Sequence, residues 1–233
     1  MSVGVCAIAY GKEHVNECKN LISKINTEFY VLTDDETFVT DNSIVDKTTF
    51  NFNKKRIPIL EAFKKHDTVI CFDTDIDLKT NIDHNQFENI EDGLYVKWFG
   101  GLQFIRGHRV SINQILKSST PFDDLNQYGM ALTECGANES NIGFFDEYVF
   151  ILKIRDENKR KEFIYNWESI NNRTINRQPK DRHGKNLNGA VESLIISLAC
   201  NLTGISLYFT ELQPFFNAIV HYDSVQPPSK TIL

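Results

Sequence analysis

Three continuous apolar runs in the first third of the chain constrain its fold most strongly. They are Val3–Ala9, Phe29–Thr33 and Thr68–Phe72, and polar residues or a glycine follow each of them. Runs without polar alternation are typical of strands that are buried on both faces of a parallel sheet. Apolar residues at helical spacing predict helices between the runs, over residues 13–25 and from Pro58 to residue 65. The sequence therefore predicts an α/β fold with a Rossmann-like N-terminal half.

The rest of the chain mixes strand and helix patterns. Strands are expected over residues 94–98 and 102–105, with Gly100-Gly101 as a bulge or kink between them. The polar, basic stretch 171–188 predicts a loop that either gates a ligand or is a solvated connection. Further helices are predicted over residues 110–117, 146–153, 157–170 and 187–202. We expect a single domain over residues 1–233, with a mixed central sheet flanked by helices.

Composition narrows the possible partners and the compartment. The chain has 233 residues and a net charge of −6, which argues against nucleic acid or an anionic membrane as a partner. Its five widely spaced cysteines contain no C-x-x-C pair, which favours a reducing compartment. No apolar stretch approaches the roughly 18 residues of a membrane span, and the first run lacks a basic leader. We expect a soluble, cytoplasmic protein.

An acidic cluster follows the third apolar run. Residues two apart in an extended segment point to the same side, so Asp73 and Asp75 present paired carboxylates, which Asp77 can join. They come at the carboxyl end of a buried parallel strand, where open α/β sheets bind ligands. Like charges this close repel, and oxygen ligands suit Mn²⁺ or Mg²⁺. The cluster therefore predicts a metal site that can hold a diphosphate.

Three other interpretations of this cluster remain open. The first is a solvated acidic turn, because Asp-x-Asp is common by chance. The second is a phosphatase of the haloacid dehalogenase type, whose nucleophile motif also follows an apolar strand. That family has Thr or Val where this chain has Asp77, and its motif follows the first strand rather than the third. The third is a non-catalytic module that binds a metal or a nucleotide.

Several segments together resemble the GT-A-type glycosyltransferases. The likeness begins with Tyr30–Asp34, Arg56–Phe63 and Val69–Asp75, which are similar to the nucleotide-binding half of that family. The resemblance implies that residues 1–80 bind the nucleotide and residues 81–233 bind the sugar and the acceptor. It also implies that the Asp-x-Asp pair binds Mn²⁺ or Mg²⁺ and, through the ion, the diphosphate of a nucleotide-sugar donor.

Two further segments carry the resemblance toward the sugar. Trp98–Gly107 is similar to the strand that faces the donor sugar, which implies sugar contacts from Gly100, Gly101 and Gln103. Asn138–Tyr148 resembles an acidic segment that opens the next helix near the reacting sugars. The resemblance implies that Asp146 contacts the sugar, and the candidate catalytic carboxylates are Asp146, Glu147 and Glu192. Without a catalytic role, Asp146 and Glu147 are favourable charges in the first turn of a helix.

The C-terminal segment Ala218–Pro228 resembles the ending of the retaining family 8 transferases, and the chain as a whole is similar to the retaining families 6 and 8. There the resemblance implies that His221 completes the metal shell, whereas a lone histidine is ordinarily a surface or core residue. This chain departs from the family's Lys-Pro-Trp ending, with Pro227 in place of the lysine and Ser229 in place of the tryptophan; Lys230 is a substitute contact for the phosphates. The small size of the chain is also similar to that of the capsid-glycosylating enzymes of large algal viruses.

The nucleoside is expected near the end of the first apolar run. The Tyr10 ring can stack on a base, or it can cap the core, and the backbone of Ile8 and Ala9 can read the base edge. Arg56 precedes a predicted helix start, where a cation indicates a nearby anion or base unless it is simply solvated. Thr74 lies between the paired carboxylates and completes the predicted nucleotide-binding set.

These observations predict transfer of a sugar from a nucleoside diphosphate donor, UDP-linked in the simplest case, to a hydroxyl of a glycan or glycoprotein. The metal would act as a Lewis acid for the leaving diphosphate. An inverting reaction needs a carboxylate base, whereas a retaining one can pass the proton to the leaving phosphate. The family 8-like ending favours retention.

Overall fold

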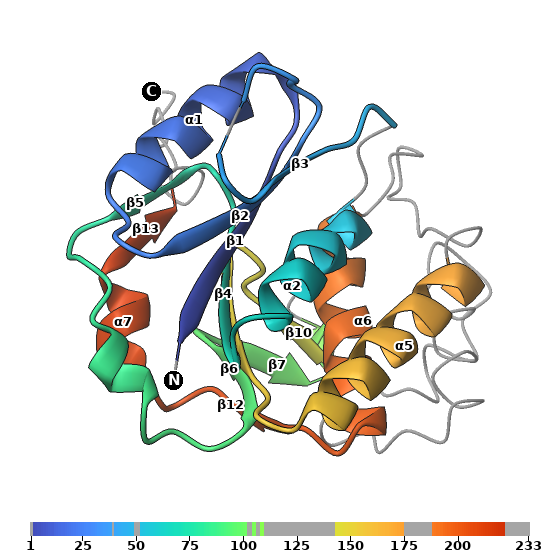
Figure 1. The fold of residues 1–233 in the computed structure, drawn as a ribbon. Coiled ribbons are helices and arrows are strands. Elements are labelled where there is room, and N and C mark those ends of the chain that lie inside the picture. Colours follow the sequence, from blue (N-terminus) through green and yellow to red (C-terminus); the bar gives the residue numbers. More distant parts are fainter. Residues whose placement is uncertain are drawn as a thin grey trace, which may run out of the picture.

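A seven-stranded mixed sheet forms the centre of the protein in this computed structural model, which describes residues 2–38, 40–48, 52–101, 104–105, 108–109, 143–174 and 188–221. The strand order is β12-β6-β11-β4-β1-β2-β3 (Figure 1). In chain order these strands are β1 (Val3–Ala9), β2 (Glu28–Thr33), β3 (Ser43–Val45), β4 (Thr68–Phe72), β6 (Gly93–Val96), β11 (Val149–Lys153) and β12 (Ser206–Tyr208).

The pairing within this sheet is parallel except around one strand. β1 pairs in parallel with both β2 and β4, β2 with β3, and β12 with β6. β11 lies antiparallel between β4 and β6. β4 and β6 therefore run in the same direction, and their carboxyl ends lie at the same edge of the sheet. This arrangement confirms the predicted α/β class with a mixed central sheet.

Helices cover both faces of the sheet (Figure 1). On one face, α1 and α7 pack with Val5 and Ala7 of β1 and with Phe72 of β4. On the other face, α2, α5 and α6 pack with Cys6 of β1 and Cys71 of β4. Successive strand residues thus enter opposite cores, which explains why the apolar runs are continuous. The helical elements are α1 (Gly11–Ser23), η1 (Phe52–Lys55), α2 (Arg56–Phe63), η2 (His84–Phe87), α5 (Glu157–Thr174), α6 (Asn188–Leu202) and α7 (Gln213–Asn217).

Short strand pairs complete the described structure. β5 (Ile76–Leu78) pairs with β13 (Ile219–His221), β7 (Phe99–Gly101) with β10 (Gly143–Phe145), and β8 (Phe104–Ile105) with β9 (His108–Arg109), all antiparallel. Within the described ranges, no helix combines the length and the apolar character that crossing a lipid bilayer requires.

The prediction of a helix over residues 146–153 is wrong. Val149–Lys153 is instead β11, a strand whose five residues are all buried in the middle of the sheet. A short apolar run has no periodicity that separates a doubly buried strand from a buried helix. Here the β-branched and aromatic side chains of Val149, Phe150 and Ile151 decide for the strand.

Other predicted boundaries shift by a few residues. α2 begins at Arg56, so Pro58 is its third residue and not its first. Gly100 and Gly101 do not interrupt a strand, because both belong to β7 and pair with Phe144 and Gly143 of β10. The helix predicted over residues 110–117 lies outside the described residues. The first two predicted helices and those over 157–170 and 187–202 are confirmed as α1, α2, α5 and α6.

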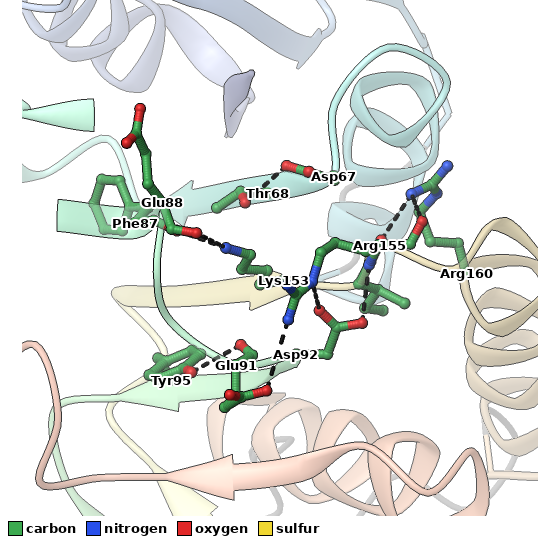
Figure 2. Close-up of polar contacts among 11 residues, drawn as sticks. Asp67, Thr68, Phe87, Glu88, Glu91, Asp92, Tyr95, Lys153, Arg155 and Arg160 are labelled. Atoms are coloured by element: carbon green, nitrogen blue, oxygen red, sulfur yellow. Dashed lines mark hydrogen bonds and ion pairs between the residues drawn. The ribbon is translucent and has the colours of Figure 1, made fainter. Parts of the chain in front are cut away.

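A buried lysine anchors the edge of the sheet opposite the carboxyl end of β4. Lys153 is the last residue of β11 and lies across from Thr68, the first residue of β4. Its side chain is fully buried, and Nζ donates hydrogen bonds to the carbonyl oxygens of Phe87 (2.6 Å) and Glu88 (2.9 Å) (Figure 2). Burial lowers the pKa of Lys153. The contact ties the chain that follows η2 to the central sheet.

Candidate metal and nucleotide-sugar site

The site begins where β4 ends. Asp73 and Asp75 follow Phe72, and Ile76 then starts β5. β5 pairs with β13 in a register that places His221 across from Ile76. As a result, Nε2 of His221 lies 3.1 Å from Oδ2 of Asp75, although the two residues are far apart in the sequence.

Asp73, Asp75 and His221 form a compact group, which we call the triad. One ligand atom from each side chain lies within 4.8 Å of the other two, and all three residues are partly buried. Two carboxylate oxygens and one imidazole nitrogen suit Mn²⁺, and Mg²⁺ accepts the same oxygens. The donor set therefore fits the divalent ion that the sequence predicts.

Asp77 does not join this group. Its carboxylate pairs with Lys24, the residue that directly follows α1. Thr74 also faces α1, where its hydroxyl donates to Glu17 Oε2 (3.1 Å) and lies 3.1 Å from His14 Nδ1. The side-chain alternation expected of an extended segment thus separates Asp73 and Asp75 from the residue between them.

Lys55, which the sequence did not single out, holds the first carboxylate. It is the last residue of η1, its side chain is only 3% exposed, and Nζ lies 2.7 Å from Oδ1 of Asp73. Nζ also donates to the carbonyl oxygen of Glu147 at 3.3 Å. In the sequence Lys55 is one of three consecutive basic residues, and nothing in that run marks it as buried. A cation here offsets the repulsion between the carboxylates of the triad.

Tyr148 supports the histidine of the triad. Its ring stacks on the His221 imidazole with centroids 4.7 Å apart and planes 11° apart. Its hydroxyl accepts a hydrogen bond from Lys97 Nζ at 2.7 Å, and its carbonyl oxygen accepts one from the Asp73 backbone at 2.9 Å. Tyr148 therefore fixes both the imidazole plane and the start of the acidic segment. Nothing in the sequence marks Tyr148 beyond its place after Asp146 and Glu147.

The candidate catalytic carboxylates have different surroundings. Asp146 lies in the turn between β10 and β11, where burial raises its pKa while the charges of Lys97 and His221 act in the opposite direction. The Glu147 carboxylate accepts a hydrogen bond from the Ser193 backbone at 2.7 Å and so holds α6. Neither residue starts a helix, which corrects the expectation of first-turn helix charges. Glu192 lies in α6, and its side chain is outside the described structure.

The residues predicted to bind the nucleoside lie on β1, the strand next to β4. Ile8 and Ala9 are its buried last residues, and Tyr10 follows them at the same edge of the sheet as Asp73. Lys54 Nζ lies 5.2 Å from the Tyr10 ring centroid and 2.8 Å from Asp46 Oδ2. Burial and the Asp46 carboxylate raise the pKa of Tyr10, so its hydroxyl stays protonated.

Two adjacent lysines therefore connect this region to the triad, since Lys54 contacts Tyr10 and Lys55 contacts Asp73. Arg56, the next residue, lies 3.5 Å from Glu168 of α5 through its Nε atom. Of the predicted sugar contacts, Gly100 and Gly101 lie in β7, whose partner β10 leads directly into Asp146. Gln103 and residues 227–230 lie outside the described structure.

Comparison with known proteins gives a likeness in structure but none in sequence. Neither the protein-family models nor the curated proteins contain a match to this chain. One similar solved structure is the galactosyltransferase LgtC in complex with donor and acceptor sugar analogues, at 9% identity over 88% of this chain and 72% of that chain, with a TM-score of 0.43. Another is the apo structure of the bifunctional glycosyltransferase WbbM, at 9% identity over 95% of this chain and 45% of that chain, with a TM-score of 0.46. This chain thus spans less than half of WbbM.

Proposed function

We propose that this chain is a metal-dependent glycosyltransferase that uses a nucleoside diphosphate sugar, UDP-linked in the first instance. The observation that carries the proposal is the triad, Asp73, Asp75 and His221, at the carboxyl edge of a mixed α/β sheet. That edge is where open α/β sheets bind their ligands. The sequence resemblance to GT-A-type enzymes supports the same activity.

In this proposal the triad holds Mn²⁺ or Mg²⁺, which when bound acts as a Lewis acid for the leaving diphosphate. Lys55 keeps Asp73 in place through its 2.7 Å ion pair. Tyr148 orients His221 through the stacked rings. These contacts hold two of the three ligand groups, Asp73 and His221, before a substrate arrives, which reduces the reorganisation that binding requires.

The nucleoside lies over the end of β1. The backbone of Ile8 and Ala9 reads the base edge, the Tyr10 ring stacks on the base, and Arg56 and the chain at Thr74 flank the diphosphate. Stacking of a base on an aromatic ring contributes about 1–3 kcal/mol. The Tyr10 hydroxyl stays uncharged, and Lys54 beside it offsets the negative charge of Asp46.

The sugar lies between the triad and β7, against Gly100, Gly101 and Gln103. Asp146 is the carboxylate best placed to act on the sugar, because its turn adjoins the triad and Lys97. Glu147 acts by holding α6, where Glu192 lies, and not by reaching the sugar. We propose transfer to a glycan or glycoprotein hydroxyl with retention, in which the leaving phosphate accepts the acceptor's proton. A product whose anomeric configuration by NMR is opposite to that of the donor would contradict retention.

The activity can be tested without knowing the acceptor, because glycosyltransferases of this kind hydrolyse their donor slowly. The protein is incubated with Mn²⁺ and a panel of UDP and GDP sugars, and released nucleoside diphosphate is measured. We expect release with at least one donor, loss of release in Asp75→Asn, and no loss in Asp77→Asn. Asp77 is a matched control because it is two residues away and pairs with Lys24 outside the triad. Release of inorganic phosphate from phosphate esters instead would favour the phosphatase alternative.

A further inference from the structure

One aromatic side chain at the edge of the sheet is exposed without an evident structural reason. Trp98 is 51% exposed, whereas the chain's other tryptophan, Trp167, is fully buried. Tryptophan is enriched at binding interfaces, because its ring combines a large apolar face with a polar N–H group, so an exposed tryptophan beside a candidate site indicates a ligand contact. The four residues of β6 that lead up to it are all buried.

Trp98 lies at the same edge of the sheet as the triad. β6 and β4 run in the same direction on either side of β11, so the chain that follows β6 emerges beside the chain that follows β4. Lys97, immediately before Trp98, donates to the Tyr148 hydroxyl at 2.7 Å, and the Tyr148 ring stacks on His221. Lys97, the residue next to Trp98, is therefore connected to the triad through Tyr148.

A second aromatic residue follows the neighbouring strand. Phe209 comes directly after β12, which pairs in parallel with β6, and its side chain is 48% exposed. Gln213 Nε2 donates to the Lys97 carbonyl at 3.2 Å and to the Phe209 carbonyl at 2.8 Å. The amide of Gln213 thus holds the ends of β6 and β12 together, next to Trp98.

The order of the strands in the sheet separates the proposed nucleoside surface from the exposed aromatic residues. Reading across the carboxyl edge, the nucleoside residues lie at β1, the triad lies at β4, and Trp98 and Phe209 lie at β6 and β12 on the far side of the triad. A donor that places its base at β1, its diphosphate at β4 and its sugar against β7 leaves the ends of β6 and β12 for a second substrate. That substrate meets exposed aromatic rings and amide and amine groups, and Glu211, two residues after Phe209, adds a carboxylate that accepts a hydrogen bond from the Thr210 backbone at 3.1 Å.

We propose that Trp98 stacks on a sugar ring of the acceptor glycan and positions it beside the triad. A pyranose ring has an apolar C–H face, which packs against the negative face of an indole, and equatorial hydroxyls, which suit polar neighbours such as Gln213. The inference rests on the proposed glycosyltransferase activity and assigns its acceptor side. Phe209 extends the same surface along β12.

Fluorescence tests this assignment directly, because Trp98 is the exposed one of the chain's two tryptophans. The protein is titrated with methyl glycosides of glucose, galactose, mannose, N-acetylglucosamine, xylose, fucose and rhamnose, with Mn²⁺ and UDP present. We expect at least one glycoside to shift the tryptophan emission to shorter wavelength in a saturable manner, and Trp98→Phe to abolish the shift. Emission that no glycoside changes would overturn the proposal.

Kinetics separate this proposal from the proposed activity. Donor hydrolysis without acceptor reports the activity, and acceleration of donor release by the responding glycoside reports the acceptor site. We expect Trp98→Ala to keep hydrolysis within about twofold and to raise the KM for the glycoside about tenfold, the effect of losing one aromatic contact. Tyr165→Ala is the matched control, since Tyr165 is an aromatic residue of α5 that is 70% exposed.

The outcomes are distinct. A wild-type protein without donor hydrolysis contradicts the proposed activity. Normal hydrolysis together with an unchanged KM for the glycoside in Trp98→Ala contradicts only the role of Trp98.

Discussion

Nε2 of His221 lies 3.1 Å from Oδ2 of Asp75, and the antiparallel pairing of β13 with β5 holds the two residues there. Because the contact comes from backbone pairing, the imidazole is positioned before any metal binds. We predict that His221→Ala lowers Mn²⁺ affinity by at least the roughly 10–100-fold that loss of a residue supporting a metal ligand causes. Electron paramagnetic resonance of free Mn²⁺ during titration measures this. His84→Ala, in η2, is the control, and equal affinity in His221→Ala and the wild type would exclude His221 as a ligand.

The ion pair between Lys55 and Asp73 should stabilise the metal-free protein. Lys55→Met leaves a partly buried carboxylate without its cation, and breaking a fully buried pair costs about 3–5 kcal/mol. Because the Asp73 side chain is 27% exposed, we expect a smaller loss of unfolding free energy in urea. Mn²⁺ should then restore more stability to Lys55→Met than it adds to the wild type, because the ion replaces the missing charge.

Lys54→Met is the matched control for that experiment. Lys54 is the adjacent lysine, but it pairs with Asp46 and not with Asp73. It should therefore show no extra stabilisation by Mn²⁺. If Mn²⁺ stabilises Lys55→Met no more than the wild type, the Lys55 contact does not neutralise the metal-binding carboxylates.

The Lys153 contact at the opposite edge of the sheet should affect stability and not activity. Lys153→Met leaves the carbonyl oxygens of Phe87 and Glu88 without their donor, and we expect a loss of about 1–3 kcal/mol in unfolding free energy. Arg155→Ala removes the exposed ion pair with Asp92 (Figure 2) and should cost less than about 1 kcal/mol. Urea unfolding measures both variants, and an equal loss in the two would show that burial of Lys153 contributes nothing.

His66 should make stability depend on pH below neutrality. Burial lowers the pKa of its imidazole, and the nearby Glu28 carboxylate only partly opposes this. The unfolded chain therefore takes up a proton on His66 at a higher pH than the folded protein does. The stability that the neutral, buried imidazole contributes is fully present above its unfolded pKa of about 6.5 and is lost as the pH falls through its lower pKa in the folded protein. We predict that the unfolding free energy of the wild type falls more steeply between pH 7 and pH 5 than that of His66→Phe. Parallel curves would contradict this assignment.

Three strands of the N-terminal half, β1, β2 and β4, were predictable because they are buried on both faces, whereas the short and partly exposed β3 and β5 were not predicted. All residues of Val3–Ala9 and Thr68–Phe72 are buried, so neither strand has a solvent-facing position that requires a polar residue. The continuous apolar runs, and the helices between them, can therefore be identified from the sequence. The same property made Val149–Lys153 ambiguous, because a lysine ends an apolar run that fits either a strand or a buried helix. The direction of β11 depends on long-range pairing that no local pattern encodes.

Some residues of the candidate site could likewise be predicted from local sequence, and others could not. Asp73 and Asp75 follow a recognisable strand, so their proximity could be predicted from local alternation. His221 was expected through family resemblance, and the structure brings it to Asp75 through the pairing of β5 with β13. Lys55 and Tyr148 could not be identified, because their roles depend on which tertiary neighbours they meet: one a buried carboxylate, the other an imidazole plane.

Calorimetric titration with UDP and GDP measures whether the triad binds a nucleoside diphosphate through a metal ion. We predict binding of at least one nucleotide with Mn²⁺, loss of that binding in EDTA, a loss of about a hundredfold or more in Asp75→Asn, and unchanged binding in Asp77→Asn. Binding of equal strength in EDTA, or in Asp75→Asn, would show that the nucleotide does not bind through a metal ion held by the triad.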